Sequence, residues 1–336
     1  MNRNSQLGGL LRRPEAGALL GLVAVLIFFT IFGGVTFLKP AGMSSWLNVA
    51  ANLGVIAIPV GLLMVAGELD ISVGAMVPFG AMTVAVISGH FGFSIWLGIA
   101  VALGFGILVG LVNGYMVVRT AVPSLIVTLG SLFAVQGVVL GLTVLITKST
   151  SVALATDGAA KAIFGDFIMG GQLQAMVFWW FIITGLYIYF VHFSRFGNWI
   201  FAMGGDKVSA RNAGIPTEKL TITLFVLSST SAAFVGMCQA ILYNSAQVAG
   251  GQSYIFNAII AVVVGGVLLT GGFGSIIGIF FGTITFAVVN QGIYYTDFDR
   301  NWSSLIIGIL LLVAVLMNNT FRKMALSYSP KKGAKA

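Results

Sequence analysis

The stretch Ala66-Gly67-Glu68-Leu69-Asp70-Ile71-Ser72-Val73-Gly74 interrupts an apolar run that extends from about Trp46 to Ser88. Glu68 and Asp70 are the only charged residues of that run. A membrane-spanning helix needs about 20 apolar residues, so the run is too long for one span and fits two. Because carboxylates that face lipid are costly, we expect both charges where two helices meet, at a membrane face or at a helix break within the bilayer.

Two interpretations of this stretch remain open. In the first, Asp70 caps the second helix by accepting a hydrogen bond from the backbone N–H of Ser72 or Val73. In the second, the stretch lines a water-filled path that a substrate passes. We expect both to apply to Asp70 and favour the path for Glu68. The predicted pathway residues are Glu68, Asp70, Ser72 and Asn113.

The composition places the chain in the membrane. It has 336 residues, of which 58% are hydrophobic and only 8% are charged, with a mean hydropathy of +1.02. A soluble domain carries about 25% charged residues. We therefore predict an all-α polytopic membrane protein, and the 44 glycines suit closely packed helices.

Several function classes are disfavoured. The single cysteine, Cys238, cannot form an internal disulfide, and His90 and His192 have no partner at metal-ligand spacing. No lysine follows a glycine, so the chain has no phosphate-binding P-loop. We expect no metal, no cofactor and no enzymatic activity in this chain, and any ATP hydrolysis in a separate subunit.

Hydropathy predicts about ten transmembrane helices. Their approximate ranges are 17–37, 46–66, 71–88, 93–118, 124–146, 176–193, 221–242, 255–269, 276–294 and 305–317. The fourth and ninth ranges are both rich in glycine and carry an asparagine, Asn113 or Asn290. Because they lie five spans apart, they would run in opposite directions, which suggests an inverted repeat.

The basic residues predict the orientation. With ten spans and the N-terminus inside, 13 of the 17 lysines and arginines fall on the cytoplasmic side. Both termini are then cytoplasmic: a tail over 1–16, one transmembrane domain over 17–320 and a basic tail over 321–336. The net charge of +8 is explained by this bias and indicates no nucleic acid. The largest inside loop is 194–220, and the largest outside loop is 147–174.

The inside loop contains a predicted short helix. Gly204-Gly205 ends any helix that enters the loop, Asp206 can cap a new one over Lys207–Ala213, and Gly214 and Pro216 stop it. Such a helix is either a docking surface for a cytoplasmic partner or an ordinary solvated connector.

Several motifs resemble the ribose-type permeases of bacterial ABC sugar importers. The segment Glu68–Gly74 looks like that family's Gly-Ile-Asp-Leu-Ser-Val-Gly signature, and Gly204–Ile215 looks like its Gly-Gly-Asn-x-x-Ala-Ala-x-x-Ser-Gly-Ile segment. Further similar stretches are Asn113-Gly114, Val122–Gly130, Gly265-Gly266 and Gly272–Gly278. The chain departs from the family pattern at Glu68 for glycine, Asp206 for asparagine and Ala213 for serine.

The resemblance implies a multi-pass permease subunit in the bacterial inner membrane that carries a monosaccharide or similar polyol from periplasm to cytoplasm. Its implied partners are a cytoplasmic ABC ATPase, a periplasmic sugar-binding protein, a second permease (a copy or a sister chain) and membrane lipid. The ATPase would contact the inside loop at Gly204, Gly205, Asp206, Ala210, Arg211 and Gly214. The alternatives are an ion-coupled secondary transporter of a small polar solute, and a structural or channel-forming subunit.

Overall fold

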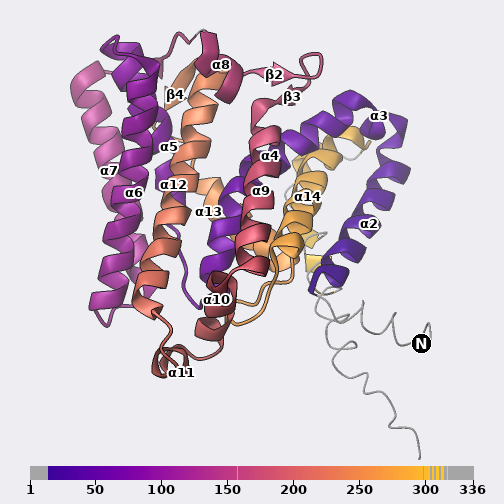
Figure 1. The fold of residues 1–336 in the computed structure, drawn as a ribbon. Coiled ribbons are helices and arrows are strands. Elements are labelled where there is room, and N and C mark those ends of the chain that lie inside the picture. The colour runs from indigo at the N-terminus through magenta and orange to yellow at the C-terminus, as the bar shows by residue number, and fades with distance from the viewer. Residues whose placement is uncertain are drawn as a thin grey trace, which may run out of the picture.

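The computed structural model describes residues 14–297 apart from 157, residues 299–302, and the isolated positions 305, 308, 309, 312, 313 and 316. The described chain is mainly helical (Figure 1). The first half contains α2 (Pro14–Phe32), α3 (Gly34–Leu38), α4 (Pro40–Val65), α5 (Val73–Val84) with a π-helical extension η1 (Ala85–His90), α6 (Ile95–Arg119) and α7 (Ser124–Thr147). The second half contains α8 (Gly158–Phe164), α9 (Ala175–Phe193), α10 (Arg195–Gly205), α11 (Lys207–Asn212), α12 (Thr217–Tyr243), α13 (Gln252–Val264), α14 (Ile276–Gly292) and the 3₁₀ turns η2 (Ile293–Tyr295) and η3 (Arg300–Trp302).

Four short strands lie at one end of the helices. Strand β1 (Ser151–Ala153) pairs antiparallel with β4 (Ser245–Gln247), and β2 (Phe167–Ile168) pairs with β3 (Leu173–Gln174). Together with α8 they form the end of the molecule opposite α10 and α11 (Figure 1). The predicted outside loop 147–174 is thus folded onto this end.

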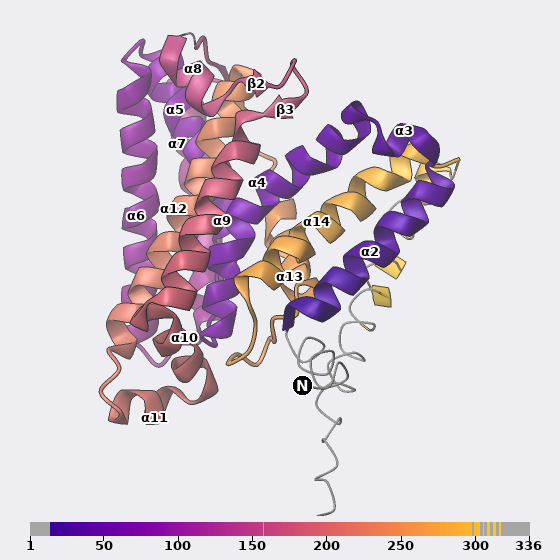
Figure 2. The same cartoon turned by 45° about the vertical axis from the view of Figure 1, so that its right-hand side comes forward.

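Helix α4 lies at the centre of the bundle. Of the 18 consecutive residues that form its most apolar part, 83% are buried, whereas the same fraction is 28% for α6, α7 and α9. Helix α4 contacts α9, α12, α13 and α14, and α12 in turn packs against α5 and α6. Figure 2 shows α2, α14 and α4 side by side, leaning away from the group formed by α5, α6, α7 and α12. The outward faces of α6, α7 and α9 are apolar, as lipid or another membrane subunit requires.

The structure confirms a polytopic helical membrane protein, but the predicted spans need correction. Eight described helices are long and apolar enough to cross a membrane. The predicted span 17–37 is broken into α2 and α3 at Gly33 and Gly34, and Gly34 has φ +64°. The predicted span 255–269 is only the 13-residue α13, because Gly266 ends that helix with φ +90°. Of the predicted span 305–317 only the six isolated positions given above are described, so this span stays a prediction.

The glycine-rich helices use their glycines for close packing. Gly110 and Gly114 of α6 lie against the backbone of α12, and Gly278 and Gly282 of α14 lie against the end of α13. A Cβ added at Gly282 would meet the Ala261 carbonyl oxygen at 2.1 Å. Packing therefore accounts for these glycines, and the inverted repeat stays a prediction.

Candidate functional site

The break between α4 and α5 is built around a glycine. Gly67 has φ +85°, its N–H donates to the Met64 carbonyl at 3.0 Å, and the Glu68 N–H donates to the Leu63 carbonyl at 2.9 Å. This pair of bonds is a Schellman motif, which satisfies the last carbonyls of a helix and needs a left-handed residue. The same pattern ends α13, where the Val267 N–H reaches the Val262 carbonyl.

Beyond Gly67 the non-helical backbone of the break forms hydrogen bonds with side chains of α7. The Leu69 N–H donates to Ser124 Oγ at 3.1 Å, and the Ile71 N–H donates to Thr128 Oγ1 at 3.3 Å. Since unpaired backbone groups are costly within a membrane protein, these two hydroxyls stabilise a non-helical segment that the helices enclose.

Asp70 is buried and turns the chain into α5. The residue is 1% exposed, and its Oδ1 accepts hydrogen bonds from the Ser72 N–H at 2.9 Å and the Ser72 hydroxyl at 2.5 Å. The predicted bond from the Ser72 N–H is therefore present. The helix begins at Val73, with Ser72 at the N-cap position, rather than at Ile71 as predicted.

A buried polar chain continues from Asp70 into two further helices. Asn113 Nδ2 of α6 donates to Ser72 Oγ at 3.0 Å, and Asn113 Oδ1 accepts a hydrogen bond from Ser131 of α7. Ser72 and Asn113 are both fully buried. The structure thus brings three of the predicted pathway residues together as a network that joins the start of α5 to α6 and α7.

Glu68, the fourth predicted pathway residue, forms an ion pair. Its Oε1 lies 2.5 Å from Nζ of Lys207, which is 139 positions away at the start of α11. The Glu68 side chain is 12% exposed and that of Lys207 is 43% exposed. Partial burial of the carboxylate reduces screening by water and salt, so this pair is stronger than a fully solvated one.

Direct backbone contacts reinforce the ion pair. A Cβ at Gly204, near the end of α10, would lie 1.7 Å from the Val65 carbonyl oxygen at the end of α4. That oxygen also accepts a hydrogen bond from the Gly272 N–H at 2.8 Å. We call this meeting of the α4–α5 break, the α10–α11 turn and the α13–α14 loop the inside junction, after the predicted inside loop 194–220 that contributes α10 and α11.

The predicted short helix is present as α11. Asp206 is its N-cap and accepts a hydrogen bond from the Ser209 N–H at 2.7 Å. Hydrogen bonds from Ser209 hold the pKa of the Asp206 carboxyl below its usual value. Gly214 follows the helix with φ +83°, and Arg211 forms an exposed ion pair with Glu218 at 3.2 Å. The helix ends at Asn212, one residue earlier than predicted.

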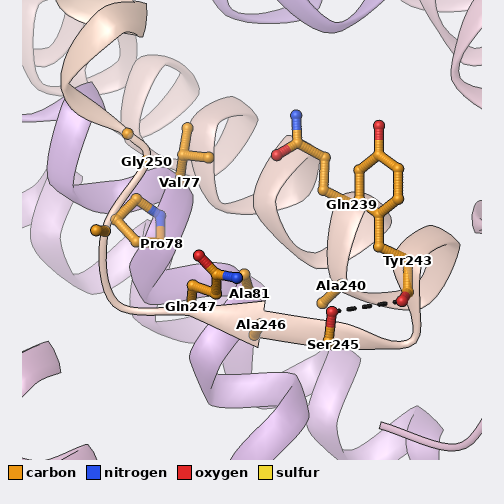
Figure 3. A pocket seen from close by; sticks show the side chains of 12 residues that line it. Val77, Pro78, Ala81, Gln239, Ala240, Tyr243, Ser245, Ala246, Gln247 and Gly250 are labelled. Carbon is orange, nitrogen blue, oxygen red and sulfur yellow. Dashed lines mark hydrogen bonds between the residues drawn. The ribbon is translucent and has the colours of Figure 1, made fainter. Parts of the chain in front are cut away.

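A second polar region, at the end opposite α11, was missed by the sequence prediction. Two adjoining cavities of about 270 and 310 Å³ share Gln239, Tyr243 and Gly250 in their walls. Figure 3 shows Gln239 and Tyr243 projecting side by side from α12. Glu68, Asp70, Ser72 and Asn113 line neither cavity. We call the two cavities together the carboxamide chamber. The sequence pattern that could have pointed to it is the pair Asn48 and Asn52, which lie at helical spacing within an apolar run.

Comparison with known proteins identifies the family. Residues 42–315 match the family described as branched-chain amino acid transport system / permease component, and the chain belongs to it. It is therefore a membrane-embedded transport permease.

Individual relatives cover nearly the whole chain. The fructose import permease protein FrcC of Rhizobium meliloti is 28% identical over 93% of this chain and 87% of its own length. The ribose import permease protein RbsC of Escherichia coli K12 is 28% identical over 92% of this chain and 94% of its own. The inner membrane ABC transporter permease protein YjfF of the same strain is 29% identical over 80% of each chain. A solved structure, PsaBC from Streptococcus pneumoniae in complex with Fab, is a distant match with a TM-score of 0.41 and 17% identity, covering 86% of this chain and 92% of that chain.

Proposed function

We propose that this chain is the membrane-spanning subunit of an ATP-driven importer in the bacterial inner membrane, and that it carries a monosaccharide or similar small polyol into the cytoplasm. The observation that carries the proposal is the Glu68–Lys207 ion pair within the inside junction. It connects α11, an exposed helix that a cytoplasmic ATPase can contact, to the break that follows α4, the most buried of the eight described spans.

The exposed face of α11 suits a protein partner. Val208 is 69% exposed, and the side chain of Arg211 is 70% exposed. On its other side Ala210 is buried, and α10 turns Gly197, Ile200 and Met203 toward the bundle. A partner that moves α11 would therefore move α10 and the end of α4 with it.

ATP would bias the permease by population shift. An ATPase that binds α11 more tightly in one permease conformation favours that conformation by its differential affinity. ATP hydrolysis belongs to the ATPase subunit, because this chain has no P-loop. A periplasmic binding protein would deliver the solute at the opposite end, and a second permease, identical or related, would complete the path within the lipid bilayer.

One observation favours ion-coupled secondary transport as a second candidate. Oδ2 of Asp70 and Oγ of Ser228 are buried without a well-formed hydrogen bond, although the two residues are neighbours. A buried carboxylate of this kind can take up a proton during transport. Against coupling, Asp70 has no ion-pair partner among the described residues.

The docking assignment can be tested with Ala210→Pro. Proline removes the hydrogen bond from the Ala210 N–H to the Asp206 carbonyl, 3.0 Å long, and destabilises an α-helix by about 3 kcal/mol. We expect normal membrane insertion but loss of the co-purifying ATPase and of ATP-driven uptake. Unchanged ATPase binding and uptake would contradict the assignment. Uptake that depends on a proton gradient and not on ATP would favour the second candidate.

A further inference from the structure

We propose that the carboxamide chamber is the site where the permease itself holds its solute, and that it selects an uncharged polyhydroxylated molecule of monosaccharide size. This inference rests on the proposed function and adds the site and the chemistry of the solute. The polar side chains of the chamber lining that carry the argument are Asn48, Asn52, Gln174, Gln239, Tyr254 and Asn257.

The lining is polar without charge. None of the described residues that line the two cavities is Asp, Glu, Lys, Arg or His. An anion such as a sugar phosphate would find no counter-charge there and would lose solvation without compensation. A neutral polyol, which both donates and accepts hydrogen bonds, matches carboxamide and hydroxyl groups, because each carboxamide also does both. Ligand cavities run from about 300 to 1,000 Å³, so two adjoining cavities near the lower limit suit a small solute.

The carboxamides are held in place by one another. Asn52 Nδ2 donates to Gln174 Oε1 at 2.8 Å, and Gln239 Nε2 donates to Asn52 Oδ1 at 3.2 Å. Gln239 Nε2 also donates to Tyr254 Oη at 2.5 Å. The network therefore joins α4, β3, α12 and α13, and a side chain fixed by such bonds loses little entropy when it binds a solute.

Some hydrogen-bond donors and acceptors of the chamber wall are unused among the described residues and can bind a solute. Both N–H groups of Gln239 are used within the network, whereas no hydrogen bond to its Oε1 exists among the described residues. The Asn257 carboxamide is half-buried in the chamber wall and forms no hydrogen bond within the described part of the chain. These groups supply an acceptor from α12 and both a donor and an acceptor from α13.

The chamber and the inside junction share a helix. Asn48 and Asn52 lie in the first half of α4, and Val65, which contacts Gly204 and Gly272, is its last residue. A movement of α4 driven at the junction would therefore shift two carboxamides of the chamber relative to Gln239. This connection offers a direct way to release a held solute.

The first part of the test measures ATP-driven uptake by the intact importer, with its ATPase and binding protein, in membrane vesicles with matched amounts of assembled complex. The probes are labelled D-ribose and D-fructose, the sugars in the names of two of the relatives, with ribose 5-phosphate as the anionic comparison. Absence of ATP-driven uptake of any sugar by the unchanged protein would overturn the proposed function. The variants below are read only with a sugar that is carried.

The variants isolate the chamber. We expect Gln239→Leu to lower the sugar carried per ATP hydrolysed by about tenfold. Asn257→Ala, which breaks no side-chain hydrogen bond among the described residues, should lower it by about threefold. The matched control is Gln136→Leu, which removes a carboxamide from α7, a helix that lines neither cavity. It should change the sugar carried per ATP hydrolysed by less than about twofold. If Gln239→Leu does not assemble, Asn257→Ala decides, and a ratio equal to that of the unchanged protein would overturn the chamber assignment.

The second part tests occupancy directly. Asn257→Cys, in a background with Cys238→Ala, is labelled with a thiol reagent in the assembled importer. We expect the carried sugar to slow labelling at least about fivefold and ribose 5-phosphate to have no effect. A labelling rate that the carried sugar leaves unchanged would show that the solute does not occupy the chamber.

Discussion

The inside junction and the carboxamide chamber lie at opposite ends of α4 and use different polar chemistry. The junction joins three loops through a charged pair and backbone contacts that leave no room for a Cβ at Gly204. Among the described residues, the lining of the chamber has only uncharged side chains, and Gln239 and Asn257 keep unused hydrogen-bonding groups. A tightly fitted joint transmits force, whereas a neutral polar cavity binds and releases a solute. Under the proposals made above, one helix serves both tasks in one subunit.

The largest loss of uptake is expected from adding a side chain at Gly204, where the inside junction leaves no room for a Cβ. Gly204→Ala places a Cβ 1.7 Å from the Val65 carbonyl oxygen and 2.6 Å from the Gly272 nitrogen, both of them backbone atoms. Overpacking of this kind costs about 1–3 kcal/mol or more. We expect ATP-driven uptake to fall more than about tenfold, measured per assembled complex.

The matched control for this variant is the next residue. A Cβ at Gly205 meets nothing within 4 Å. Gly205→Ala should keep normal thermal stability and, although Gly205 lies in the predicted ATPase-contact loop, should lower uptake by less than about twofold. Equal effects of the two substitutions would mean that the close approach of α10 to α4 does not matter.

The next largest effect is expected in the buried hydrogen-bond network of Asp70, Ser72 and Asn113, which adjoins the inside junction in the chain. Asp70→Ala leaves the N–H and the hydroxyl of Ser72 without their acceptor, at a cost of about 1–3 kcal/mol for a buried polar group. Asp70→Asn keeps one acceptor oxygen and offers a donor toward Ser228. We therefore expect Asp70→Ala to lower the melting temperature and uptake clearly, and Asp70→Asn to remain close to the unchanged protein.

This pair of variants also separates the two candidate functions. If Asp70→Asn is as inactive as Asp70→Ala while its melting temperature is normal, the charge of Asp70 takes part in transport. That outcome would favour ion coupling over a structural role for this carboxylate.

The smallest effect is expected at the exposed cap of α11. Asn caps a helix about as well as Asp, so Asp206→Asn should leave ATPase binding unchanged, whereas Asp206→Ala should weaken it slightly. The pKa of the Asp206 carboxyl is lowered, so the charged cap stabilises the helix fully at any pH above the ordinary carboxyl pKa of 3.8. This stabilisation is lost only as the pH falls through the lowered pKa. ATPase binding measured from pH 5 to 8 should therefore show no step from this group. A step that Asp206→Asn abolishes would contradict this account.

Local patterns in the sequence predicted much of the fold. Hydropathy located the long helices, and the order Gly205, Asp206, Gly214 predicted α11 to within one residue, because caps depend on neighbours in the chain. The early end of α13 was missed because the apolar residues after Gly265 look like a continuing helix, although the glycines end it.

Contacts between distant segments could not be predicted in this way. Nothing near Glu68 in the sequence points to Lys207, and nothing near Asn113 points to Ser131 as a partner. The chamber collects carboxamides from α4, β3, α12, β4, α13 and α14, one or two from each, so no single segment carries a recognisable motif. Packing of the helices brings these groups together.

The most direct test of the central claim, that the inside junction passes the state of the ATPase to the bundle, is a charge exchange across the ion pair. Uptake per ATP hydrolysed is measured for Glu68→Lys, for Lys207→Glu and for the double exchange, with matched complex levels. Each single variant places like charges where the two side chains now lie 2.5 Å apart, and should lower the ratio by roughly fivefold. The double exchange should recover at least half of the unchanged ratio. Single variants that couple normally, or a double exchange that recovers nothing, would contradict the claim.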